Sequence, residues 1–239
     1  MRGMPILVAL GVFMAVPAAA QEWMEYRSVR DGFHALFPGE PSVTDTTWAS
    51  QAGFMLPERV YTVERGAERY VVRVIDYRDV EQRGIERAKG CPPGAEPCLG
   101  SVNLAGVGYW KHDVRGAPTY ALLQFVRRGG QVTDLFWNQL DLVSGIMAQM
   151  VNADGSRTYT YIAMHEMRLY LSEATVPAGY PEPLIFTQAV GWLDQEGRAI
   201  RYRNMYSHEI HGLREATVPE ANAGAGGGRG GGGAQGGNQ

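Results

Sequence analysis

The sequence is short of cysteine, of long apolar runs and of surplus positive charge. Its 239 residues include two cysteines and carry a net charge of −3. This balance argues against a general binder of nucleic acid or anionic membranes, because such proteins need a basic surface. Beyond the N-terminal leader, no apolar run reaches the roughly 18 residues typical of a membrane-spanning helix. We therefore expect no transmembrane segment in the processed chain.

The sequence also lacks the compact motifs of common catalytic sites. It contains no G-x-S-x-G elbow, no H-E-x-x-H pair and no P-loop. A hydrolase whose residues meet only after folding would leave no such motif, so it stays open as an alternative. The pattern favours a protein that is not an enzyme and that needs no cofactor.

Residues 1–20 have the composition of a secretory signal peptide. Arg2 supplies a short positive region, residues 5–16 are apolar, and small alanines end at Ala20. This order predicts cleavage before Gln21 and export to the periplasm. The alternative, an N-terminal membrane anchor, is disfavoured because the apolar run is shorter than the roughly 20 residues that span a bilayer.

The remainder divides into one domain and a tail. Residues 216–239 are rich in glycine and alanine and have little to bury, so we expect this tail to be disordered. Residues 21–215 have the length of a single domain with a sizeable core.

Cys91 and Cys98 lie in the stretch GCPPGAEPCLG. Its prolines and glycines bend the chain, and the expected oxidising compartment favours a disulfide. Closing so short a loop would contribute roughly 2–2.5 kcal/mol in the chain-entropy model. A zinc site would favour closer spacing and a second ligand pair, and a redox centre would favour C-x-x-C. We predict a structural disulfide, with metal and redox roles as the alternatives.

Short stretches of alternating apolar and polar residues dominate the domain and predict β-strands. We expect a hairpin with arms 59–64 and 69–77 around Gly66, and a helix over 78–89. A later helix is expected over 180–197, because prolines stand at its entry and Gly197 at its exit. The other predicted strands are 31–37, 42–50, 107–115, 119–128, 131–143, 145–151, 156–166, 168–176 and 198–207. This order predicts an α+β class, with an antiparallel meander flanked by helices in a single domain.

Three segments carry a resemblance to a known group. They are FHALFPGEP (33–41), RYVVRVIDY (69–77) and RLYLSEATVP followed by LIFTQAVGWLD (168–194). Together they resemble exported proteins of Gram-negative bacteria that are similar to the PsbP-like group. The resemblance implies an antiparallel sheet flanked by helices and an accessory or binding role without enzymatic activity. It places no functional residue on this chain.

Two clusters suggest a second hypothesis, a periplasmic copper- or metal-handling protein. His208, Glu209 and His211 offer imidazole and carboxylate ligands, and Met164, His165 and Met167 offer thioether and imidazole ligands suited to copper. The simpler interpretations are a solvated linker for the first cluster and core packing for the second.

Aromatic residues suggest a ligand pocket. Tyr109, Trp110, Trp137, Tyr159 and Tyr161 all lie on the predicted meander. They are candidates for lining an apolar pocket, although aromatics also pack sheets without any ligand. The preferred hypothesis is therefore an exported accessory or binding protein whose partner is an unidentified envelope protein or small ligand.

Overall fold

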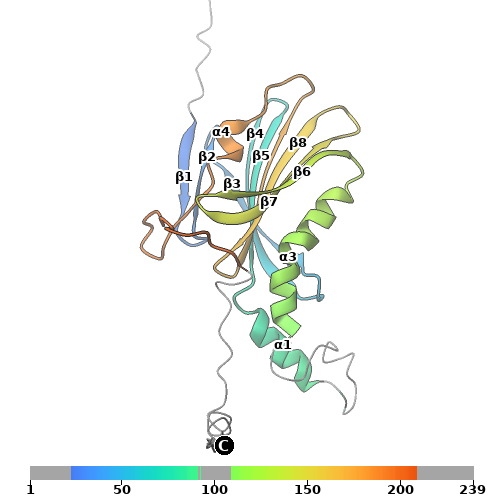
Figure 1. Ribbon diagram of the computed structural model, residues 1–239, viewed down its shortest axis with the longest axis vertical. Helices are drawn as coiled ribbons and strands as arrows, with labels where there is room; N and C mark the ends of the chain where they lie inside the picture. The colour runs from blue at the N-terminus through green and yellow to red at the C-terminus, as the bar shows by residue number, and fades with distance from the viewer. Residues whose placement is uncertain (1–22, 91, 93–108, 209–239) are drawn as a thin grey trace, which may run out of the picture.

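A computed structural model describes residues 23–90, 92 and 109–208 (Figure 1). In this part of the chain no helix is both long and apolar enough to cross a membrane. The helices are α1 (Val80–Lys89), α3 (Tyr109–Val126) and α4 (Leu184–Thr187). The strands are β1 (Met24–Ser28), β2 (Phe33–Phe37), β3 (Ser42–Ala49), β4 (Met55–Arg65), β5 (Glu68–Asp76), β6 (Gln131–Leu140), β7 (Val143–Val151), β8 (Arg157–His165), β9 (Arg168–Val176) and β10 (Gly191–Trp192).

A seven-stranded antiparallel sheet forms the centre of the molecule, in the order β3-β4-β5-β9-β8-β7-β6. The predicted hairpin around Gly66 is confirmed as β4 and β5, and Gly66 has a positive φ of 61°. Two other hairpins turn through Asp141–Leu142 and Glu166–Met167, and all four of these residues have positive φ. Paired positive φ values are typical of the type I′ turn, whose twist matches that of the flanking strands.

A three-stranded antiparallel sheet, β1-β2-β10, covers one face of the large sheet. Phe33, Phe37 and Trp192 of the small sheet are fully buried against Tyr61 and Tyr170 of the large sheet. Burying an aromatic side chain contributes about 1.5–3 kcal/mol relative to leaving it exposed. This aromatic layer therefore holds the two sheets together.

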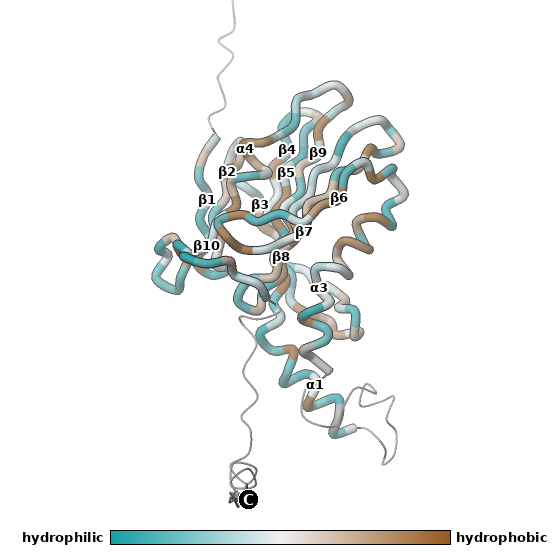
Figure 2. Tube along the Cα trace, in the orientation of Figure 1, coloured by the Kyte–Doolittle hydropathy of each residue, from teal (hydrophilic) through white to brown (hydrophobic). Residues whose placement is uncertain are grey.

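Helix α3 lies over the other face of the large sheet, and α1 packs against α3 (Figure 1). Val114, Ala117, Ala121 and Phe125 are spaced by three or four residues and are almost completely buried. Such spacing forms one stripe along a helix, and Figure 2 shows α3 with brown, hydrophobic stretches along its length. With both faces of the antiparallel meander covered, the α+β class predicted from the sequence is confirmed.

The prediction of two strands over 107–115 and 119–128 is wrong, because residues 109–126 form the single helix α3. Gly116 and Pro118 are typical turn residues, but both lie inside this helix. An internal proline removes one helical hydrogen bond and costs about 3 kcal/mol or more. Burial of the apolar stripe on the sheet offsets this cost.

The predicted helix over 180–197 is also corrected, since α4 spans only Leu184–Thr187. The chain then extends so that Gly191 and Trp192 pair with β2, and the Leu193 N–H donates to the Gly32 carbonyl at 3.0 Å. The expected strand over 198–207 is reduced to isolated bridges, one of them between Val143 and Tyr206. Burial of Trp192 in the sheet interface overrides local helix preference here.

Several predictions fall on parts of the chain that the structure does not describe. They are the signal peptide over residues 1–20, the disulfide between Cys91 and Cys98 and the tail over 216–239. These stay predictions, as does the exact extent of the domain.

Candidate functional site

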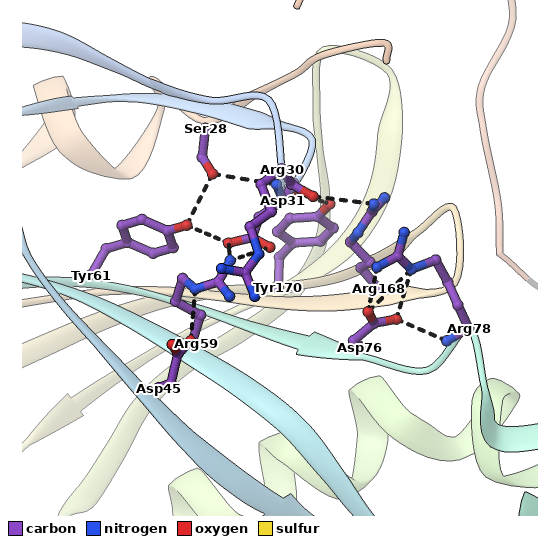
Figure 3. A network of polar contacts seen from close by, with 10 residues as sticks. All are labelled: Ser28, Arg30, Asp31, Asp45, Arg59, Tyr61, Asp76, Arg78, Arg168 and Tyr170. Carbon is purple, nitrogen blue, oxygen red and sulfur yellow. Dashed lines mark hydrogen bonds and ion pairs between the residues drawn. The ribbon is translucent and has the colours of Figure 1, made fainter.

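A buried ionic network joins the turn between β1 and β2 to the large sheet (Figure 3). Asp31 and Arg59 are each only 9% exposed. The Arg59 Nη1 atom donates to both carboxylate oxygens of Asp31, at 2.9 and 2.7 Å, and its Nε donates to Asp45 at 2.8 Å. The Tyr61 hydroxyl also donates to Asp31.

The same turn is held through its backbone. The Tyr170 hydroxyl donates to the Asp31 carbonyl at 2.6 Å, and the Asp31 N–H donates to the Ser28 Oγ at 3.3 Å. Burial, followed by the hydrogen bond to Asp31, raises the pKa of the Tyr61 hydroxyl far above its ordinary value. Tyr61 therefore stays a neutral donor at physiological pH. Because these groups are engaged with one another, we interpret the network as a junction between the sheets.

A charged hollow of about 220 Å³ lies beside this junction. Most of its charges are in ion pairs: Arg78 donates to Asp76 at 2.9 Å through Nε, and Arg59 binds Asp31 and Asp45. Burial alone would raise the pKa of Asp76, but the hydrogen bonds from Arg78 outweigh it and hold the pKa below its usual range. The hollow is thus lined mainly by ion-paired side chains, whereas a typical ligand pocket is mostly apolar.

A larger and more apolar cavity lies where the described chain begins. This Trp23 pocket has a volume of about 360 Å³. Trp23 packs edge-on against Tyr70 of β5 with ring centroids 5.2 Å apart, and Leu184 and Ile185 form an exposed apolar rim at 48% and 53% exposure. The full lining is Trp23, Arg65, Glu68, Tyr70, Val176 and residues 180–185.

The lining of the Trp23 pocket also includes an ion pair, next to the aromatic rings. The Arg65 Nη2 donates to Glu68 at 2.7 Å, the Tyr70 hydroxyl also donates to Glu68, and the Arg65 guanidinium lies 5.6 Å from the centre of the Trp23 ring. Burial acts to raise the pKa of Glu68, but the bonds from Arg65 and Tyr70 outweigh it and lower the pKa. Glu68 is therefore ionised at neutral pH. The pocket combines an aromatic and aliphatic wall with one ion pair.

A buried histidine forms the centre of a third cluster. His165, at the end of β8, is 1% exposed and packs on Trp192 with ring centroids 4.5 Å apart. Its Nε2 lies 2.6 Å from the Tyr202 hydroxyl, and Tyr206 packs on another side of the ring with centroids 4.9 Å apart. Burial, aided by the charge of Arg168, lowers the pKa of His165 to about 3. The imidazole is therefore neutral in the folded protein.

The metal candidates are not brought together in the described residues. Met164 packs on the helix-covered face of the large sheet, whereas His165 points to the opposite face, as alternation along a strand requires. Met167 lies in the following turn, partly buried beside Met164. Among the described residues, no three His, Cys, Asp or Glu side chains gather where they could hold one metal ion. Glu209 and His211 lie outside the described residues, and the Nε2 of His208 lies 3.2 Å from the Arg115 carbonyl.

The three aromatic candidates whose side chains the structure describes likewise do not line one pocket. Tyr159 and Tyr161 are buried at 2% and 1% exposure, and Tyr161 donates to the Val143 carbonyl at 2.7 Å. Trp137 is 58% exposed on β6 and lines a separate hollow of about 260 Å³. Tyr109 and Trp110 open helix α3, and their side chains lie outside the described part.

The sequence analysis overlooked the residues that form the Trp23 pocket. A local signal was present in YPEPLI, residues 180–185, where two prolines and exposed apolar residues follow one another. Trp23 carried no such signal, because its neighbours in the pocket come from distant parts of the chain.

Comparisons with known proteins give a likeness in structure but no match in sequence. No family model matches the chain, and no curated protein matches it. The fold is similar to the solution structure of cyanobacterial PsbP (CyanoP) from Synechocystis sp. PCC 6803, with 13% sequence identity and a TM-score of 0.35. The match covers 72% of this chain and 87% of that chain. A likeness of this size carries no argument about function.

Proposed function

We propose that the chain is an exported accessory domain without enzymatic activity, which binds a small apolar or amphipathic ligand in the Trp23 pocket. The observation that carries the proposal is the pocket itself, about 360 Å³ in volume and walled by Trp23, Tyr70 and residues 180–185. Ligand pockets typically measure about 300–1,000 Å³ and combine an apolar wall with few polar groups.

The shape of the lining indicates the chemistry of the ligand. Trp23 and Tyr70 offer ring faces and edges, and the rim residues Leu184 and Ile185 offer aliphatic surface. The ion pair of Arg65 and Glu68 belongs to the lining beside the two rings, and a polar group of the ligand could pair with it there. An aromatic ring or a short acyl chain with one polar end fits this arrangement best.

Replacing Ile185 with aspartate is expected to weaken ligand binding by about tenfold or more, because the substitution removes apolar contact and adds charge at the rim. The probe is N-phenyl-1-naphthylamine, a neutral aromatic molecule whose fluorescence rises in apolar surroundings. Titration of the wild-type protein should saturate at one probe per chain. Ile185 is 53% exposed, so the variant should keep its fold, which a thermal unfolding curve would verify.

The matched control is Leu123→Asp, because Leu123 is a similarly exposed aliphatic residue on α3. It should bind the probe like the wild-type protein. Binding that does not saturate, or that Ile185→Asp leaves unchanged, would contradict the proposed site.

Export is supported by the composition of residues 1–20 and gives a separate expectation. Cleavage before Gln21 would leave Trp23 as the third residue of the mature chain, at the pocket. The intact mass of the chain from the periplasm of a Gram-negative host should start at Gln21. It should also lie two hydrogens below the reduced mass, because Cys91 and Cys98 are expected to pair. A chain that keeps Met1 and stays in the cytoplasm would refute export without touching the binding proposal.

A further inference from the structure

The outer edge of β6 differs from the other edge of the large sheet. Leu135, Phe136 and Trp137 follow one another and are 54%, 45% and 58% exposed. Within the described residues β6 pairs only with β7, so its other side carries unpaired backbone groups. At the opposite edge, β3 is mostly Ser, Thr and Asp.

Proteins usually protect edge strands with charges, prolines or bulges. In β6 a register irregularity lies between Val132 and Asp134, and Asp134 is the only charged residue of the strand. Residues 134–139 beyond this point are regularly paired with β7. They form an edge with apolar side chains and no basic residue or proline to oppose pairing.

Both faces of this edge are apolar. Trp137 and Leu135 pair with Ile146 and Ala148, which lie on the face covered by α3. Phe136 pairs with Met147, which belongs to the core on the opposite face. A strand that pairs with this edge would have apolar neighbours on both faces of the sheet. Because its side chains alternate between the two faces, it needs apolar residues at successive positions.

We propose that β6 pairs antiparallel with β6 of a second copy of this chain, which joins the two large sheets across a two-fold axis. In the register that places Phe136 opposite itself, Leu135 lies opposite Trp137 of the second copy, and Asp134 lies opposite Asn138. Apolar residues then meet apolar residues, and a carboxylate meets an amide. A two-fold interface requires such self-complementarity.

Charge also favours this register. The two Asp134 carboxylates lie four residues apart along the paired strands, about 13 Å at about 3.3 Å per residue. That separation exceeds the Debye length of about 8 Å at physiological salt, so their repulsion is largely screened. The second copy therefore supplies both the apolar sequence and the charge pattern that this edge requires.

The test is the mass of the full chain in solution, measured by sedimentation equilibrium over a range of micromolar concentrations. We expect a monomer–dimer equilibrium that Trp137→Lys weakens by at least about tenfold, since a lysine on an edge strand opposes pairing. Leu135→Lys serves as a second variant on the same edge. The matched control is Val43→Lys, because Val43 is 47% exposed on the opposite edge strand β3.

Hydrogen exchange locates the interface. Amides in 134–139 should be more protected at high than at low protein concentration, and this difference should vanish in Trp137→Lys. A wild-type chain that stays monomeric throughout would overturn the proposal. So would a dimer that survives both β6 variants, or one that Val43→Lys alone disrupts.

Discussion

Replacing Arg59 with methionine is expected to lower the free energy of unfolding by about 3–5 kcal/mol, because the substitution leaves a buried charge unpaired. The side chains of Arg59 and Asp31 are only 10% and 12% exposed, and Arg59 contacts both Asp31 oxygens. Without Arg59 the Asp31 carboxylate keeps only its bond from Tyr61 among the side-chain contacts that the structure shows. Urea unfolding at pH 7 measures the effect.

Two comparisons separate the ion pair from the packing of the long side chain. Arg198→Met removes an exposed ion pair with Asp194 and should leave the unfolding midpoint nearly unchanged. In an Asp31→Asn background, Arg59→Met should lower the free energy of unfolding clearly less than it does in the wild-type protein. The reason is that no carboxylate charge at position 31 is then left unpaired. If Arg59→Met lowers the free energy of unfolding no more than Arg198→Met does, the network does not hold the sheets together.

Lowering the pH from 6.5 to 4.5 is expected to destabilise the wild-type protein by about 2–3 kcal/mol more than a His165→Phe variant. The pKa of His165 is lowered to about 3 in the fold by burial and by Arg168, whereas an unfolded histidine has a pKa of about 6.5. Between these values the unfolded chain binds a proton that the folded chain does not. The stability contributed by neutral His165 is therefore complete above pH 6.5 and is lost progressively down to pH 3.

Urea titrations at the two pH values measure this difference. The groups that titrate elsewhere contribute equally to both proteins, so the comparison isolates His165. The same substitution at His112, an exposed residue of α3, should leave the pH dependence of the wild-type protein intact. An equal pH dependence in wild type and His165→Phe would show that the imidazole takes up its proton without opening the cluster.

Strand predictions succeeded where alternation was regular and one residue marked the turn. The hairpin around Gly66 is an example, because glycine readily adopts the positive φ that the turn needs. The turns at Asp141–Leu142 and Glu166–Met167 include Leu142, Glu166 and Met167, which rarely take positive φ, so no local pattern could identify their geometry. Helix α3 was missed because Gly116 and Pro118 are ordinary turn residues, and only burial against the sheet makes a helix the better choice.

The candidate site was harder to predict than the fold, because its residues are far apart in the sequence and meet only in the folded protein. Trp23 meets Tyr70 and residues 180–185 only after both sheets have formed. Asp31 meets Arg59 and Tyr170 in the same way. Spacing along the chain holds no information about such encounters. The residues that it did single out, such as Tyr159 and Tyr161, belong to the core.

The small sheet draws its strands from the two ends of the domain. Phe33 of β2 pairs with Trp192 of β10, roughly 160 residues later in the chain, and such distant pairings slow folding. While the chain is being synthesised, the aromatic layer stays open until β10 has left the ribosome. The order of the strands thus delays completion of the core until the last strand of the small sheet is available.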